Sequence, residues 1–205
     1  MGGKIGGKQA YRASIFHVLD DPRYNKDAYE FLEDGILVVE NGKVSALGHK
    51  ETGSVLCPNP PSNMFLGSGL FKFQKAKDFG VKVALGTDFG AGNTFSMLRS
   101  MEEAYKTAQL QGYSLSPFEA FYLTTLGGAR ALAMDDKLGN CEFGKEADFV
   151  VLDKQSTPFL AWRMDHAKPP LEILFVLMML GDDRAVKATY VYGNKLHDRD
   201  APSSN

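Results

Sequence analysis

One aspartate, Asp88, stands where a catalytic carboxylate is expected. It follows the short apolar run Val81–Leu85 and precedes the glycine-rich turn Gly90–Gly92. In strand-helix repeats, ligands bind beyond the carboxyl ends of the strands. An aspartate there can ligate a metal ion and accept a proton from metal-bound water. The same residue could instead cap the next helix, because the helix dipole stabilises negative charge. The spacing alone leaves both interpretations open.

Partners for a metal at Asp88 are hard to find. A catalytic zinc ion usually has three protein ligands, and the chain has four histidines, His17, His49, His166 and His197. No two of them form a His-x-His or His-Glu-x-x-His motif. We place each one in the β-rich ends of the chain or in a loop, as a surface or hydrogen-bonded histidine.

The two cysteines, Cys57 and Cys141, are far apart and outside any Cys-x-x-Cys spacing. This argues against a disulfide framework and against a cysteine zinc site. We therefore expect both to be buried structural thiols.

Two further segments offer polar groups. The proline-rich segment Cys57–Asn63 is predicted to be a rigid loop, in which Ser62 and Asn63 either line a pocket or cap the next helix. Asp182-Asp183-Arg184 could be an acid/base pair, which needs two carboxylates in distinct environments. Adjacent residues past a helix end more often form a turn and a salt bridge, and we expect that here. Glu102-Glu103 is interpreted as a solvated face.

Composition limits the class of protein. The 205 residues are 44% hydrophobic and carry a net charge of −2, which favours a globular protein without nucleic acid or an anionic membrane as partner. The most apolar run, Leu171–Leu180, has about half the length of a membrane span. No signal peptide is recognisable, so we expect a cytoplasmic protein.

The pattern of elements is β-rich at both ends and α/β between them. Two hairpins are predicted, one through Asn41-Gly42 and one through Gly193-Asn194. Ser116, Pro117 and Glu119 mark a helix start, and Gly181 a helix stop. The other expected elements are helices at 69–79, 95–111, 129–134 and 171–180, a helix break at Gly127-Gly128, and strands at 81–85 and 147–152. On the helix at 95–111, the stripe Met97, Met101, Ala104, Tyr105 and Ala108 is expected to pack in the core.

Several motifs together resemble the amidohydrolase superfamily, and within it the guanine deaminases of the bacterial type. Gly86-Thr87-Asp88 is similar to the end of the eighth barrel strand, and Ser62-Asn63 to the segment after the seventh. The other matching segments, in chain order, are Glu33–Val39 within Tyr11–Leu47, Leu66–Phe71, Ser96–Leu98, Thr125–Leu132, Gly139-Asn140, Phe143–Val151, Leu180–Arg184 and Tyr190–Gly193.

The departures from this family are as informative as the matches. Members are longer, and their first barrel strand carries a His-x-His pair for zinc. Later strands supply another histidine ligand, a glutamate proton shuttle and a histidine beside the metal. Here the sequence runs from about Gly53 directly into material of the seventh strand, and Leu56 replaces the histidine expected before Cys57-Pro58. Of the metal and acid/base residues, only Asp88 carries over.

The resemblance implies an α/β fold: a remnant of a (β/α)8 barrel, with its last two βα units and C-terminal helices, and a small β-sandwich domain. We expect that domain to comprise 1–52 and 138–205, and the barrel remnant 53–137. The implied reaction is zinc-dependent hydrolysis of guanine to xanthine and ammonia, with Asp88 as metal ligand and catalytic residue. Because one carboxylate does not hold zinc, we expect this chain alone to be inactive and not to bind zinc stoichiometrically. The alternatives are a non-catalytic module that pairs with an intact homologue or forms a homo-oligomer, and a truncated gene product.

Overall fold

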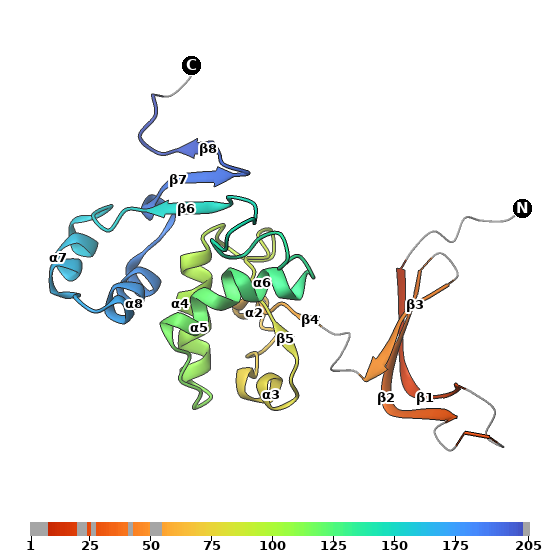
Figure 1. Ribbon diagram of the computed structural model, residues 1–205. Helices are drawn as coiled ribbons and strands as arrows, with labels where there is room; N and C mark the ends of the chain where they lie inside the picture. Colours follow the sequence, from red (N-terminus) through yellow and green to blue (C-terminus); the bar gives the residue numbers. More distant parts are fainter. Residues whose placement is uncertain (1–7, 20–23, 26–27, 41–42, 50–54, 203–205) are drawn as a thin grey trace, which may run out of the picture. The chain divides into compact units, whose positions relative to one another are not determined.

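A computed structural model describes residues 8–19, 24–25, 28–40, 43–49 and 55–202 (Figure 1). Contacts within the chain divide it into two units, one formed by 1–55 with 79–81 and the other by 56–78 with 82–205.

The first unit is an antiparallel sheet of β1 (Lys8–Val18), β2 (Tyr29–Glu40) and β3 (Lys43–His49) in that order. Glu40 is the register partner of Lys43, which confirms the first predicted hairpin, although Asn41-Gly42 lie outside the described residues. A Cβ on Gly35 would lie 2.8 Å from Leu32 Cβ. Glycine at this position therefore allows the buried Leu32 side chain to lie over the strand.

Strand β4 (Val55–Leu56) leads into the second unit and is followed by two short helices, α2 (Pro60–Phe65) and α3 (Phe73–Asp78). Strand β5 (Lys82–Val83) comes next. The predicted loop at 57–63 is thus partly helical. The predicted helix at 69–79 starts only at Phe73, because Gly67 and Gly69 have φ of 67° and 99° and keep the chain in a turn. The strand expected at 81–85 is likewise shorter: the Leu85 amide donates to Leu123 O over 3.1 Å.

The main core of this unit includes buried residues of α4 (Met97–Gln109) and α5 (Pro117–Thr124), which contact each other. The next helix, α6 (Leu126–Ala131), contacts α5 (Figure 1). Ser96 caps α4 and Ser116 caps α5, each accepting a bond from the amide three residues on. The predicted core stripe is confirmed: its buried members are Met101, Ala104 and Ala108, and Met97 and Tyr105 pack against them.

Two expectations about these helices are wrong. The break after α5 falls at Thr125, with φ −126° and ψ −104°, two residues before Gly127-Gly128. These glycines lie inside α6, where a Cβ on Gly127 would come within 2.8 Å of Tyr122 O. Glu102 is not solvated but 7% exposed, because it lies between Arg99 and Lys106 and pairs with both at 2.6 Å.

The C-terminal part forms a second antiparallel sheet, β6 (Phe149–Leu152), β7 (Val186–Val191) and β8 (Asn194–Asp198) in that order. Between β6 and β7 the chain forms α7 (Pro158–His166), which was not predicted, then α8 (Pro170–Leu180) and a 3-10 turn, η1 (Asp183–Ala185). The second predicted hairpin is confirmed, but its left-handed residues are Tyr192 and Gly193, at φ 51° and 75°, one position earlier than expected.

Among the described residues, β1–β3 form one hydrogen-bonded sheet and β6–β8 form another. The predicted domain made of 1–52 and 138–205 stays a prediction. Within the described residues, no helix is both long and apolar enough to cross a membrane.

A substitution at Gly181 can test the packing at the end of α8. A Cβ at this position would lie 2.7 Å from Leu98 Cδ1 and overlap Leu177 O. We expect Gly181→Ala to lower the free energy of unfolding by about 1–3 kcal/mol, as overpacking of a core does. Gly128→Ala is the matched control: its Cβ would meet Leu123 O at an ordinary 3.6 Å inside a helix, so stability should stay the same or rise by up to about 1 kcal/mol. Urea unfolding measures both, and equal effects of the two substitutions would contradict this packing.

Because the pKa of Tyr113 is raised, we expect the protein to lose stability at alkaline pH. Its hydroxyl donates to Glu119 Oε1 over 2.5 Å, and burial, with this bond and the Glu119 charge, raises the pKa of Tyr113 to about 12 from 10.0. Between these two values the unfolded chain has lost the phenolic proton while the folded chain retains it. Stability should therefore fall as pH rises through this range.

Urea midpoints measured on both sides of this range provide the test. The decrease should be smaller in Tyr113→Phe, which cannot ionise. An equal decrease in both proteins would rule out Tyr113 as its source.

Candidate functional site

Asp88 is held by a serine from a distant part of the chain. Ser62 Oγ donates to Asp88 Oδ2 over 2.7 Å. Ser62 lies in α2 and is 2% exposed, whereas Asp88 itself is exposed. One carboxylate oxygen is thus engaged by a buried hydroxyl.

Parallel pairing of two segments brings these residues together. The Ala84 amide donates to Leu56 O over 3.0 Å and the Gly86 amide to Pro58 O over 3.3 Å. Both partners advance together along the chain, so the two segments run parallel and their carboxyl ends lie at the same edge. Helix α2, which contains Ser62, and the loop that contains Asp88 follow these ends.

The turn at Asp88 has a demanding backbone. Asp88 has a φ of 47°, a left-handed conformation that aspartate tolerates better than most residues. Its carbonyl oxygen accepts bonds from the amides of Ala91, at 3.2 Å, and Gly92, at 2.7 Å. A Cβ on Gly92 would lie 2.6 Å from Thr87 O. Glycine is therefore required for this tight turn.

The capping interpretation of Asp88 is wrong, because Ser96 caps α4. Between Asp88 and this cap, Phe89 and Phe95 stack with ring centroids 3.6 Å apart, and both are more than half exposed. Asp88 thus sits on an open loop rather than at a helix end.

The loop after β4 packs closely against the Asp88 loop. A Cβ on Gly86 would overlap Asn59 Oδ1 and lie 3.0 Å from Cys57 Sγ. The Asn59 amide donates to Asn63 Oδ1 over 3.1 Å. This segment was expected either to offer polar contacts or to cap the next helix. Ser62 makes a polar contact with Asp88, and Asn63 accepts a bond from the amide of Asn59, which immediately precedes α2.

Cys57 is a protonated thiol in this environment. Partial burial of its sulfur, and secondarily the negative charge of Asp88, raise the pKa of the Cys57 thiol. The thiolate, which is the nucleophilic form, is therefore disfavoured. Both cysteines are exposed and free, so the expectation of buried thiols is wrong. The reason is that Cys57 lies in a surface loop after a two-residue strand and Cys141 in a segment without helix or strand.

Neither His166 nor His197 forms a metal-binding group with Asp88 among the described residues. His166 ends α7, not a loop as expected, and its Nδ1 lies 2.9 Å from Trp162 O. His197 lies exposed on β8. The backbones of His17 and His49 belong to β1 and β3 in the other unit.

The Asp182 cluster is a salt bridge in a turn, as expected. Asp182 Oδ2 lies 2.5 Å from Arg184 Nη2, and Asp182 Oδ1 accepts a bond from the Arg184 amide over 3.0 Å. These bonds lower the pKa of Asp182, so it is a structural carboxylate and not a proton donor.

The donor set around Asp88 does not fit a zinc ion. Across the described parts of the chain, no three His, Cys, Asp or Glu side chains come together in a way that could hold a metal. Asp88 offers one carboxylate, one oxygen of which already accepts the Ser62 bond, and three protein ligands are usual for catalytic zinc.

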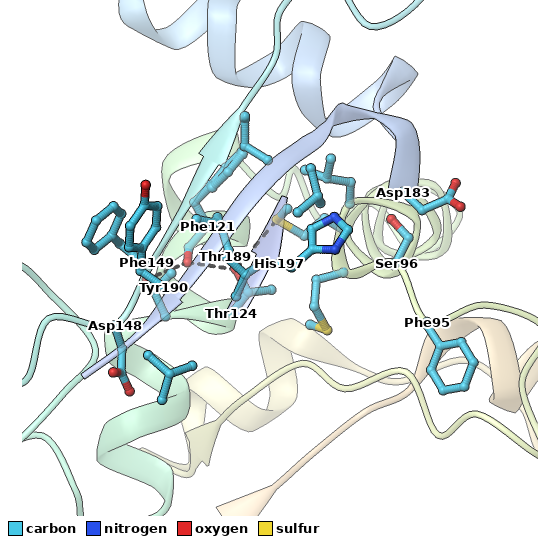
Figure 2. A pocket seen from close by; sticks show the side chains of 18 of the residues that line it. Phe95, Ser96, Phe121, Thr124, Asp148, Phe149, Asp183, Thr189, Tyr190 and His197 are labelled. Carbon is cyan, nitrogen blue, oxygen red and sulfur yellow. Dashed lines mark hydrogen bonds between the residues drawn. The ribbon is translucent and has the colours of Figure 1, made fainter. Parts of the chain in front are cut away.

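A cavity of about 1120 Å³ lies between the β6–β8 sheet and the helices α4 and α5, and Asp88 is not among its lining residues (Figure 2). Phe149 and Tyr190 stack on its sheet side with centroids 4.4 Å apart, and Phe121 belongs to its helical side. Asp148, Asp183 and His197 are among its polar residues. No local sequence pattern predicts this cavity, because it forms between elements far apart in the chain.

Comparison with known proteins defines the class. The sequence profile of the amidohydrolase family matches residues 4–196, and the chain belongs to this family. Its α/β content and the strand-end aspartate agree with that assignment.

Within this family the chain is similar to guanine deaminases. It is 53% identical to guanine deaminase of Escherichia coli over 149 residues, 73% of this chain and 34% of that protein. It is 40% identical to a probable guanine deaminase of Deinococcus radiodurans over 145 residues, 69% of this chain and 33% of that protein. The chain thus spans about a third of the length of these relatives.

Solved structures agree with these relatives. The E. coli guanine deaminase structure superposes with a TM-score of 0.71 and 53% identity, and the match covers 73% of this chain and 35% of that one. The guanine deaminase of C. acetobutylicum, with guanine in its active site, gives a TM-score of 0.56 and 31% identity over 69% of this chain and 33% of that one.

A double-mutant cycle tests the contact between Ser62 and Asp88. Ser62→Ala should lower the free energy of unfolding by about 1 kcal/mol, the usual value for a hydrogen bond. Asp88→Gly removes the carboxylate and keeps the left-handed backbone. The two changes together should cost less than their sum, with a coupling of about 0.5–1.5 kcal/mol.

The exposed Ser68 makes a matched control. Ser68→Ala should change stability by less than about 0.5 kcal/mol and show no coupling to Asp88→Gly. Additive effects of Ser62→Ala and Asp88→Gly in urea unfolding would contradict the contact.

Proposed function

We propose that this chain is a partial guanine deaminase in which Asp88 is the remnant of the catalytic and metal-binding site. Its supporting observation is the position of Asp88 in the sequence Gly86-Thr87-Asp88, just beyond a parallel strand pair, in a chain 53% identical to a guanine deaminase. The reaction of guanine deaminases is hydrolysis of guanine to xanthine and ammonia.

We further propose that the isolated chain does not catalyse this reaction. Asp88 has no second and third ligand side chain beside it in the described residues. Cys57, which lies in the adjacent loop, is held as a thiol. A lone carboxylate has neither a metal-bound water to deprotonate nor a residue that would protonate the leaving amine.

The barrel assignment supports the same proposal. We propose that β4 and β5 correspond to the last two strands of the (β/α)8 barrel. They are parallel and followed by loops at one edge, as barrel strands are. Two strands do not close a barrel, so the other catalytic loops of the family have no counterpart here.

A second candidate function is a non-catalytic module that binds an intact homologue. It is favoured by apolar residues that remain exposed around the strand pair. Leu56 is 40% exposed, Met64 40% and Phe65 70%. Co-purification of the tagged chain with an intact guanine deaminase would support this function, and its loss in Phe65→Ser would locate the surface.

An ammonia assay tests the proposed function. The purified chain, supplied with guanine and zinc, should release no ammonia above a blank. Asp88→Asn should give the same value, because there is no activity for the substitution to remove. An intact guanine deaminase in the same assay is the positive control. Turnover by this chain that is lost in Asp88→Asn would overturn the proposed inactivity.

A further inference from the structure

The cavity between the β6–β8 sheet and helices α4 and α5 is a candidate ligand site apart from the Asp88 loop. All of its lining residues belong to the unit of 56–78 and 82–205, and Asp88 is not among them. Its volume of about 1120 Å³ is ample for an organic molecule, since pockets for drug-sized ligands measure about 300–1,000 Å³. A ligand in this cavity would therefore be held by residues other than Asp88.

The wall of the cavity is largely apolar and in part exposed. Val150 of β6 is 53% exposed and Val191 of β7 is 43% exposed, and both line the cavity on its sheet side. The helical side includes Met97 of α4 and Phe121 of α5. Covering apolar and aromatic surface of this kind removes it from water, which favours binding of an apolar ring system.

The two arginines on the wall already have partners outside it. The Arg184 guanidinium pairs with Asp182, which does not line the cavity. Arg199 pairs with Asp153 at 2.9 Å and with Asp200 at 2.8 Å, and neither of these carboxylates lines the cavity. Both positive charges are thus balanced without the carboxylates of the wall.

Two carboxylates on the wall, Asp148 and Asp183, have no basic partner. Among the described residues neither of them forms a salt bridge. Asp148 Oδ1 accepts a bond from the Tyr192 amide over 2.7 Å, which fixes the carboxylate and leaves its Oδ2 for a ligand. Asp148 and Asp183 lie on opposite sides of the cavity (Figure 2). An apolar wall with unbalanced negative charge is complementary to an apolar cation.

We propose that this cavity binds an arylalkylamine cation, with its rings against the apolar wall and its ammonium group at Asp148 Oδ2. Asp148 is favoured as the anchor because its carboxylate is already held in place. The next residue, Phe149, stacks on Tyr190 with centroids 4.4 Å apart, and aromatic faces also attract cations.

Three naphthalene derivatives that differ in charge test the proposal. Equilibrium dialysis of the full chain would compare 2-naphthylmethylamine, a cation, with neutral 2-naphthalenemethanol and anionic 2-naphthoate. The amine should bind about threefold to tenfold more tightly than the alcohol, because only the amine gains a charge-assisted hydrogen bond. The anion should bind most weakly. Equal binding of all three, tighter binding of the anion, or no binding of the amine would overturn the proposal.

A substitution at the anchor tests the position of the ammonium group. Asp148→Asn removes the charge and keeps an oxygen that can accept the Tyr192 bond. It should weaken binding of the amine by about threefold to tenfold and leave binding of the alcohol within about twofold. Asp165→Asn is the matched control, because Asp165 is an exposed carboxylate of α7 outside the cavity. Equal losses in the two variants, or no loss in Asp148→Asn, would contradict the anchor.

Two tryptophan substitutions on β6 test the position of the rings. Val150 lines the cavity and Val151 does not, because successive residues of a strand point to opposite faces. Val150→Trp should fill part of the cavity and weaken binding of the amine by about fivefold or more, whereas Val151→Trp should leave it unchanged. Equal binding by both variants would place the ligand elsewhere. Circular dichroism confirms that each variant is folded, and if Val150→Trp is not, the loss of charge selectivity in Asp148→Asn still decides.

Discussion

The parallel pairing of Leu56–Pro58 with Ala84–Gly86 is the constraint on which the candidate site depends. It places the ends of two segments at one edge, and from that edge Ser62 and Asp88 meet at 2.7 Å. The glycines at 86 and 92 make the meeting possible, because a side chain at either position would overlap the neighbouring loop or turn. The geometry around Asp88 therefore depends on residues 56–92 of this chain, although the chain spans only about a third of the length of the relatives it matches.

The Asp88 loop is well ordered by hydrogen bonds, although the described residues bring no set of metal ligands to it. A carboxylate on a strand-end loop is held by one buried hydroxyl, and this contact needs no metal to form. Metal binding depends on how many donors converge, and in the described residues they do not converge. The architecture of the Asp88 loop depends on packing between neighbouring segments, whereas metal-dependent catalysis in such a fold depends on residues from many strands.

The sequence predicted the elements whose signals are local. Both hairpins, the Ser116 cap and the core stripe on α4 depend on turn chemistry, capping and periodicity, and all are confirmed. The errors arose where tertiary contacts decide. Glu102 is buried because two basic side chains surround it. The helix breaks at Thr125, and Gly127 lies inside α6 so close to Tyr122 that a side chain there would overlap it. For the site, the family motif identified Asp88, but its bond to Ser62 joins residues 26 positions apart. No local pattern predicts a contact over that distance.

We propose that Asp88 keeps the family position without a metal site, and a zinc titration tests this proposal. Calorimetry would compare the full chain with Asp88→Asn under identical conditions. We expect that neither protein binds zinc stoichiometrically and that their titration curves coincide. Stoichiometric zinc binding by the chain that disappears in Asp88→Asn would contradict it.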